Sequence, residues 1–143
     1  MQFKRGDVIF VKLPYGMGSE QGGTRPAVVI QNDIGNRFSP TTIVAFFTTK
    51  DKVKLPTHVE VDPIGGLTED STLMLEQLRT IDKHRILEKI GELGTEAIEQ
   101  INQALIISLG LGGGDTNVGK SKKLANHLSY YANTADSCRS NGR

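Results

Sequence analysis

The chain has 143 residues, a hydrophobic content of 37% and a formal net charge of +1. This length suits one domain with a modest core, and the near-neutral charge argues against a general basic coat for nucleic acid. The single cysteine, Cys138, excludes an intramolecular disulfide and a cysteine-rich zinc site. Because no apolar stretch is long enough to cross a bilayer and the N-terminus does not look like a signal peptide, we expect a cytoplasmic protein.

Short apolar runs in the first part of the chain have the composition of β-strands. Three of them are rich in Val, Ile and Phe and are bounded by Gly, Pro, Asn or Asp: Val8–Leu13, Pro26–Gln31 and Thr42–Phe47. Further strands are predicted at Pro56–Val61, Ser71–Leu75 and Gln77–Ile81, with Glu76 separating the last two. This spacing predicts a strand-rich barrel.

The hydrophobic pattern changes to a helical period near the end of this region. Apolar residues recur at helical spacing from Ala97 onward, Thr95 is a suitable N-cap, and Gly110 ends the pattern. A shorter helical turn is predicted at Lys83–Glu88, with Asp82 as its cap. The predicted fold class is therefore mainly β with a C-terminal helix, an α+β arrangement.

The composition shifts to Gly, Ser, Asn and Lys after residue 111. We expect one domain over residues 1–111 and a flexible tail over residues 112–143. Gly114–Ser121 satisfies the phosphate-loop pattern G-x-x-x-x-G-K-[ST], but that pattern binds a nucleotide only after a strand in a βαβ fold. A predicted helix and a glycine linker come before it here, so a basic tail is favoured.

An arginine stands at the end of a glycine-containing loop. The loop Gly18–Thr24 leads to Arg25, and Pro26 restrains the backbone at the start of an apolar strand. A guanidinium held there suits a phosphate, because its planar fork of donors matches the phosphate oxygens. The alternative is a surface ion pair with Glu20 or Asp33, and the residues by themselves do not decide between the two.

Five separated motifs resemble the MazF/PemK toxins of toxin–antitoxin pairs. In chain order they are Lys4–Val8, Gly18–Asp33, Ser39–Thr48, Lys54–Val59 and Leu75–Arg85. They follow the family's order and cover about residues 2–111. The resemblance implies an SH3-like barrel of the CcdB/MazF type and a homodimer with RNA in a groove across the dimer interface. It also implies a cognate antitoxin with an acidic, disordered C-terminal segment, and a sequence-specific endoribonuclease that needs no metal or other cofactor.

The resemblance assigns catalytic roles to two residues. Arg25 matches the family's catalytic arginine, and Thr48 matches its catalytic threonine at the end of a strand. In the implied reaction the ribose 2′-OH attacks the adjacent phosphorus and leaves a 2′,3′-cyclic phosphate and a 5′-OH. Neither side chain is a ready proton acceptor, so the general base stays unassigned, with Glu20 the nearest carboxylate to Arg25 in the sequence.

Single-stranded RNA is recognised by stacking and by hydrogen bonds along the base edges. The RNA-binding candidates are Met17, Glu20, Gln21, Asn32, Asp33, Lys54, Leu55, His58 and Gln77. An aromatic residue often stands at the position of Met17 in the resembled toxins, which puts a stacking contact there in doubt. His58 lies on a segment that resembles one contacting RNA in the family, whereas we interpret His84 and His127 as surface residues.

Two functions from other classes stay open at this point. The same barrel resembles the CcdB toxin, which binds DNA gyrase and is no nuclease, and an SH3-like module can also be a plain binding domain. Arg25 with Thr48 favours the nuclease, because a gyrase binder has no need of a phosphate-activating pair. The nuclease hypothesis predicts that these two side chains meet around one phosphodiester.

Overall fold

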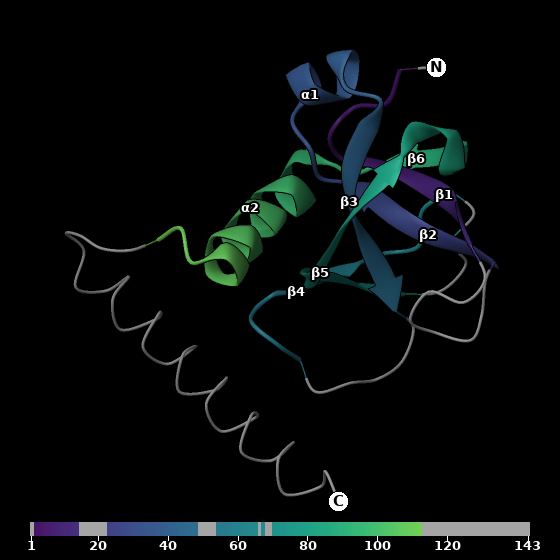
Figure 1. Cartoon of the computed structure of the whole chain (residues 1–143). Coiled ribbons are helices and arrows are strands. Elements are labelled where there is room, and N and C mark those ends of the chain that lie inside the picture. The colour runs from purple at the N-terminus through teal and green to yellow at the C-terminus, as the bar shows by residue number, and fades with distance from the viewer. Residues whose placement is uncertain (1, 15–22, 49–53, 66, 68–69, 113–143) are drawn as a thin grey trace, which may run out of the picture. The chain divides into compact units, whose positions relative to one another are not determined.

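The computed structural model describes residues 2–14, 23–48, 54–65, 67 and 70–112 (Figure 1). The elements in chain order are β1 (Asp7–Leu13), β2 (Gly23–Val29), α1 (Asp33–Phe38), β3 (Thr41–Thr48), β4 (His58–Val61), β5 (Ser71–Asp82), the 3₁₀ turn η1 (Lys83–Arg85), β6 (Ile86–Glu92) and α2 (Thr95–Leu109). The chain divides into two units, Met1–Leu109 and Gly110–Arg143, and all of these elements belong to the first. The predicted tail, apart from Gly112, and its phosphate-loop pattern lie outside the described residues.

The six strands form one antiparallel sheet in the order β4-β5-β3-β2-β1-β6. Side chains alternate between the two faces of the sheet and form two apolar clusters, one on each face. The first cluster packs the sheet against α2 and includes Val28, Phe47, Leu73, Ile101 and Leu105. The second lies on the other face and includes Ile9, Ala27, Val44, Phe46 and Met74. The predicted mainly β fold with a C-terminal helix is confirmed.

The sheet curls so that its two edges approach each other. The segment after β4 reaches β6, where Ile64 packs over Gly91 so closely that a Cβ added there would lie 2.9 Å from its side chain. Gly65 has a φ of 57°, and a Cβ on it would lie 1.7 Å from the carbonyl oxygen of Ile90. Only glycine fits this contact. The curl gives the sheet the barrel-like shape that the strand spacing predicts.

The prediction of two strands around Glu76 is wrong, because β5 continues through that residue. The β3–β5 register passes from Ala45 opposite Leu78 to Phe47 opposite Leu73, so the β5 residues between those two partners lie across from Phe46 alone. A bulge of this kind absorbs extra residues without ending the strand. The sequence signal at Glu76 marks this bulge.

Three other local features differ from the sequence predictions. The predicted helical turn is confirmed only as η1, in which Asp82 accepts the His84 N–H; residues 86–88 belong to β6 instead. Both β6 and α1 were missed. The strand predicted at Pro26–Gln31 runs from Gly23 to Val29. The C-terminal helix begins at Thr95 as expected, and Gly110 follows it with a φ of 67°.

A buried amide fixes α1 and the first residues of β3. Asn36 is 2% exposed, and its Oδ1 accepts from the hydroxyl of Thr42 at 2.7 Å and from Nε2 of Gln31 at 3.2 Å. Its Nδ2 donates to the carbonyl of Gln31 at 2.9 Å. The first end of β3 is therefore tied to α1 by polar contacts within the protein. No described helix is long and apolar enough to span a membrane.

Candidate active site

Arg25 reaches across from β2 to the last residues of β3. Its Nη2 donates to the carbonyl oxygen of Phe47 at 3.3 Å, and its Cζ lies 4.8 Å from the centre of the Phe46 ring. The Phe47 carbonyl belongs to the peptide that joins Phe47 to Thr48. The guanidinium is therefore held on two sides next to Thr48, and a ring face stabilises its charge. Arg25 therefore lies beside the peptide that precedes Thr48, and the catalytic roles of Arg25 and Thr48 stay predictions.

Strand register sets Arg25 close to the end of β3. The β2–β3 pairs are Ala27 with Phe46, Val28 with Ala45 and Val29 with Val44, and continuing this register by two residues sets Arg25 opposite Thr48. Residues directly opposite in an antiparallel pair project from the same face of the sheet. Arg25, Phe46 and Thr48 therefore share one face.

The same row continues across the next two strands. Thr48 pairs with Thr72 on β5, and Thr72 pairs with Glu60 on β4. We call Arg25, Thr48, Thr72 and Glu60 the polar row. With adjacent strands about 4.8 Å apart, Glu60 lies about 10 Å from Thr48. The row places the segment around β4 within reach of a chain molecule bound at Arg25.

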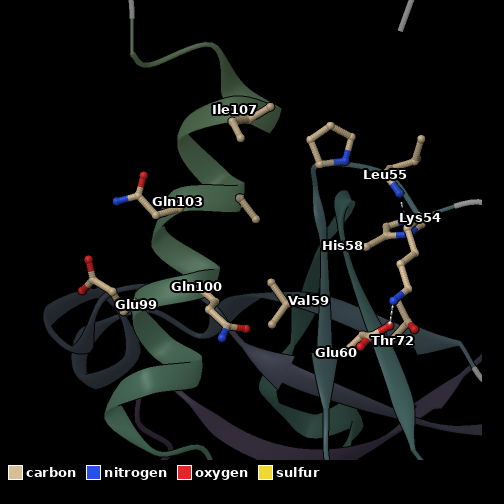
Figure 2. Close-up of a pocket in the computed structure, with 12 residues that line it drawn as sticks. Lys54, Leu55, His58, Val59, Glu60, Thr72, Glu99, Gln100, Gln103 and Ile107 are labelled. Carbon is tan, nitrogen blue, oxygen red and sulfur yellow. Dashed lines mark hydrogen bonds and ion pairs between the residues drawn. The ribbon is translucent and has the colours of Figure 1, made fainter. Parts of the chain in front are cut away.

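A groove of about 430 Å³ lies beside the β4 end of the polar row. Figure 2 shows α2 as one wall, with Gln100, Gln103 and Ile107, and the segment leading into β4 as the other. Lys54 lies on this second wall, where its Nζ is 2.6 Å from a carboxylate oxygen of Glu60. Both side chains are largely exposed, so this ion pair contributes little stability and its lysine can exchange partners.

His58 and Leu55 occupy the turn that leads into β4. The His58 side chain is 6% exposed; its Nδ1 lies 3.2 Å from the Leu55 backbone nitrogen, and its Nε2 lies 2.8 Å from a carboxylate oxygen of Glu76. Both ring nitrogens are thus bonded within the protein. RNA contact by Leu55 or His58 stays a prediction.

Other RNA-binding candidates are dispersed. Asn32 caps α1 by accepting the Gly35 N–H at 2.8 Å, and Asp33 accepts the Arg5 N–H at 2.7 Å. Both lie beyond the other end of β2 from Arg25, so the structure does not bring them to the polar row. Gln77 is exposed beside Glu76 on β5. Met17, Glu20 and Gln21 lie outside the described residues.

Asp33 does not form the alternative surface ion pair with Arg25, and Glu20 lies outside the described residues. Asp33 is too far along the sheet to pair with Arg25, and no carboxylate among the described residues forms a salt bridge with it. Only the Phe47 oxygen accepts a hydrogen bond from Arg25 within this part of the chain. Its other N–H groups are therefore suited to a phosphate. Nor do His, Cys, Asp and Glu gather into a metal-binding cluster there.

Sequence reasoning missed three residues of this region. Phe46 lies two residues before Thr48, so the strand period of two could have placed its ring under Arg25. No sequence pattern placed Thr72 or Glu76 beside the other site residues. Their relation to Thr48 and His58 depends on the pairing of β5 with two other strands, which one strand's pattern does not contain.

Residues 4–109 match the family described as the PemK-like, MazF-like toxin of type II toxin–antitoxin system. The chain is 57% identical over 113 residues to endoribonuclease EndoA of Bacillus subtilis (strain 168), a match that covers 78% of this chain and 97% of that protein. It is 50% identical over 110 residues to endoribonuclease MazF of Staphylococcus saprophyticus, covering 76% and 92% respectively. A solved structure described as an endoribonuclease in complex with its cognate antitoxin from Mycobacterial species has a TM-score of 0.64 and 27% identity, over 76% of this chain and 96% of that one.

Proposed function

Because the chain belongs to the PemK-like, MazF-like toxins of type II toxin–antitoxin systems, we propose that it is the toxin of such a pair and cleaves single-stranded RNA, messenger RNA in particular. The family resemblance stated from the motifs is confirmed, and so is the CcdB/MazF-type fold. The observation that carries the proposal is the Arg25 guanidinium, held against the peptide that precedes Thr48. Two strand ends thus supply a cation and a hydroxyl to one place.

The reaction is transesterification within the RNA. The ribose 2′-oxygen forms a bond to the adjacent phosphorus, the bond from phosphorus to the 5′-oxygen breaks, and a proton passes from the 2′-OH while the leaving oxygen gains one. The products are a 2′,3′-cyclic phosphate and a 5′-OH. No metal is required, because the nucleophile is already held next to its target.

Arg25 stabilises the charge that grows on the phosphoryl oxygens. One of its donors is occupied by the Phe47 carbonyl, and its remaining N–H groups donate to the phosphate oxygens in this proposal. The Thr48 hydroxyl orients the phosphate or the 2′-OH by hydrogen bonding. A guanidinium is too basic to lose its proton readily, so the role of Arg25 is electrostatic.

RNA binding extends from this pair along the polar row. Lys54 is paired with Glu60, which lies about 10 Å from Thr48 by strand spacing, so Lys54 offers a cation to a neighbouring phosphate. Leu55 adds an apolar contact to a base. Gln77, in the bulge opposite Phe46, offers an amide to a base edge. These contacts set a sequence preference. Asn32 and Asp33 lie too far from the polar row for this proposal to include an RNA contact by either residue.

The partners follow from the same surface. The active form is a homodimer in the cytoplasm, where messenger RNA is translated. Its inhibitor is a cognate antitoxin with an acidic, disordered segment, because carboxylates compete with phosphates for Arg25 and Lys54. A relative that has 27% identity was solved in complex with its cognate antitoxin, which supports this part of the proposal.

Cleavage of a long transcript in excess EDTA tests the proposal. The parent protein is expected to produce fragments with 2′,3′-cyclic phosphate ends, and Arg25→Ala to lower kcat/KM by about a hundredfold to a thousandfold. Thr48→Val keeps the side-chain shape and is expected to lower kcat. Absence of cleavage by the parent, or inhibition of DNA gyrase without cleavage, would overturn the proposal.

A further inference from the structure

One carboxylate holds the turn that leads into β4. Glu76 Oε1 lies 2.8 Å from His58 Nε2, and Glu76 Oε2 accepts from the Thr57 hydroxyl at 2.7 Å. The turn closes on itself as well, because the His58 N–H donates to the Leu55 carbonyl at 3.0 Å. Both oxygens of Glu76 are therefore committed to residues 57 and 58.

The hydrogen bonds assign a neutral tautomer to His58. Its Nδ1 receives the Leu55 N–H at 3.2 Å, so that nitrogen carries no proton. The ring proton is then on Nε2 and is donated to Glu76. Both ring nitrogens of His58 are therefore used to hold the turn.

The burial of these side chains raises the free-energy cost of losing their hydrogen bonds. Thr57 is fully buried, the His58 side chain is 6% exposed, and the Glu76 side chain is 25% exposed. A buried polar group that loses its partner costs more than a typical hydrogen bond gains. The turn therefore keeps one shape as long as Glu76 accepts from both neighbours.

Glu76 is also well placed relative to the reacting groups. It lies in the β5 bulge across from Phe46, the residue whose ring carries Arg25. The turn that it holds ends at β4, two strands from Thr48, and includes Leu55 next to Lys54. Glu76 thus connects the wall of the groove with the part of β5 that lies opposite Phe46, whose ring stacks on Arg25.

We propose that Glu76, acting through His58 and Thr57, is a positioning residue that holds Lys54 and Leu55 in the shape that receives RNA. The inference rests on the proposed function and deepens it. Glu76 does not touch the scissile phosphate. Its loss therefore weakens substrate binding and leaves the chemical step at Arg25 and Thr48 nearly unchanged.

Two pairs of variants of the full chain test this role. Glu76→Ala removes both acceptors, whereas Glu76→Gln keeps an amide oxygen for His58 and an NH₂ group for the Thr57 hydroxyl. Thr57→Val removes one contact without changing shape, and Thr57→Ser restores it. Glu88→Ala, an exposed carboxylate on β6, is the matched control. Thermal midpoints check that each variant is folded at the assay temperature.

Steady-state cleavage of a long single-stranded transcript provides the first measurement. KM is expected to rise about tenfold for Glu76→Ala and less for Thr57→Val, with kcat within about twofold of the parent. Glu76→Gln, Thr57→Ser and Glu88→Ala are expected to keep the parental KM. The inference is overturned if Glu76→Ala keeps the parental KM, or if Glu76→Gln loses as much as Glu76→Ala, which would mean that the charge itself acts on the RNA.

Hydrogen exchange of the Leu55 amide provides a second measurement that needs no RNA. Protection is expected in the parent and in Glu76→Gln, and its loss is expected in Glu76→Ala. Unchanged protection in Glu76→Ala would overturn the inference even with cleavage intact. Failure of the parent to cleave RNA would instead refute the proposed function, so the two failures are distinguishable.

Discussion

The described residues include two arginine–phenylalanine pairs, one near each end of β3, and they differ in what surrounds them. Arg25 lies 4.8 Å from the Phe46 ring, and Arg37 lies 5.3 Å from the Phe38 ring. Phe46 is 4% exposed, whereas Phe38 is 76% exposed. The two arginine-to-ring distances are similar, so stacking by itself does not distinguish Arg25 from Arg37. A buried ring fixes its arginine in one place, and an exposed ring does not.

The polar groups around the two pairs also differ in how many of them are already hydrogen-bonded within the protein. At the α1 end, the polar groups of Asn36 and Thr42 bond one another, which leaves few of them for a ligand. At the Thr48 end, the described residues occupy one donor of Arg25. The two ends of β3 lie about 23 Å apart by strand rise. The α1 end is held rigidly by internal hydrogen bonds, and the Thr48 end carries the groups proposed to act on RNA. Substitutions at Arg25, Asn36, Phe46 and Glu92 test whether the two ends of β3 act separately.

The largest effect is expected from Arg25→Lys. A lysine keeps the charge but loses the planar fork of donors, so kcat/KM for RNA cleavage is expected to fall about a hundredfold. Arg37→Lys is the matched control, with expected activity equal to the parent. Equal losses in the two variants, measured under the same conditions, would contradict the division between the two ends.

Asn36→Leu is expected to have the next largest effect, on stability. Leucine has the same branching and the same number of heavy atoms as asparagine, but it leaves the Thr42 hydroxyl and the Gln31 amide without their buried partner. The free energy of unfolding is expected to fall by about 3 kcal/mol, measured by urea denaturation. Cleavage at a temperature where the variant is folded is expected to stay near the parental rate. A large loss of kcat in the folded variant would show that the two ends are coupled.

Phe46→Leu is expected to have a moderate effect on activity. It removes the ring beneath Arg25 while keeping an apolar side chain in the second cluster. Losing a partly desolvated cation–π contact of about 1 kcal/mol predicts a fall in kcat/KM of about fivefold. Phe38→Leu removes the exposed ring and is expected to change nothing in the same assay. If Phe46→Leu cleaves RNA as fast as the parent, the ring does not position Arg25.

Glu92→Gln, on the strand at the far edge of the sheet, is expected to have the smallest effect. Its hydrogen bond with Lys89 lowers the pKa of Glu92 below 4.5, and the same bond, together with buried Asp7, raises the pKa of Lys89 above 10.5. The Glu92 contribution is therefore present above pH 4.5 and is lost as the pH falls through its lowered pKa. The Lys89 contribution is lost as the pH rises through its raised pKa.

Because Glu92 is exposed, solvent screens this pair. The thermal midpoint at neutral pH is expected to fall by no more than about 2 °C in Glu92→Gln, and high salt is expected to reduce that difference. The parent and the variant are expected to converge in acid, where Glu92 is protonated. A difference that persists below the lowered pKa would assign the effect to packing.

The sequence was most informative where a pattern is local. The apolar runs of β1 and β3 and the helical period of α2 are properties of single segments, so they were predicted close to their observed bounds. The short helix α1 was missed because it depends on a cap by Asn32 and on buried bonds to β3. The continuity of β5 was missed because its bulge is defined only against β3.

For the site, the residue types and the family could be inferred from the sequence. It contains Arg25 after a glycine loop, Thr48 at a strand end and five motifs in order, and the family match confirms that resemblance. The side chains that stand beside them depend on how distant strands pair. Thr72, Phe46 and Glu76 acquire their places through strand register. Register is a relation between segments distant in the chain, and it is set when both faces of the sheet are packed at once.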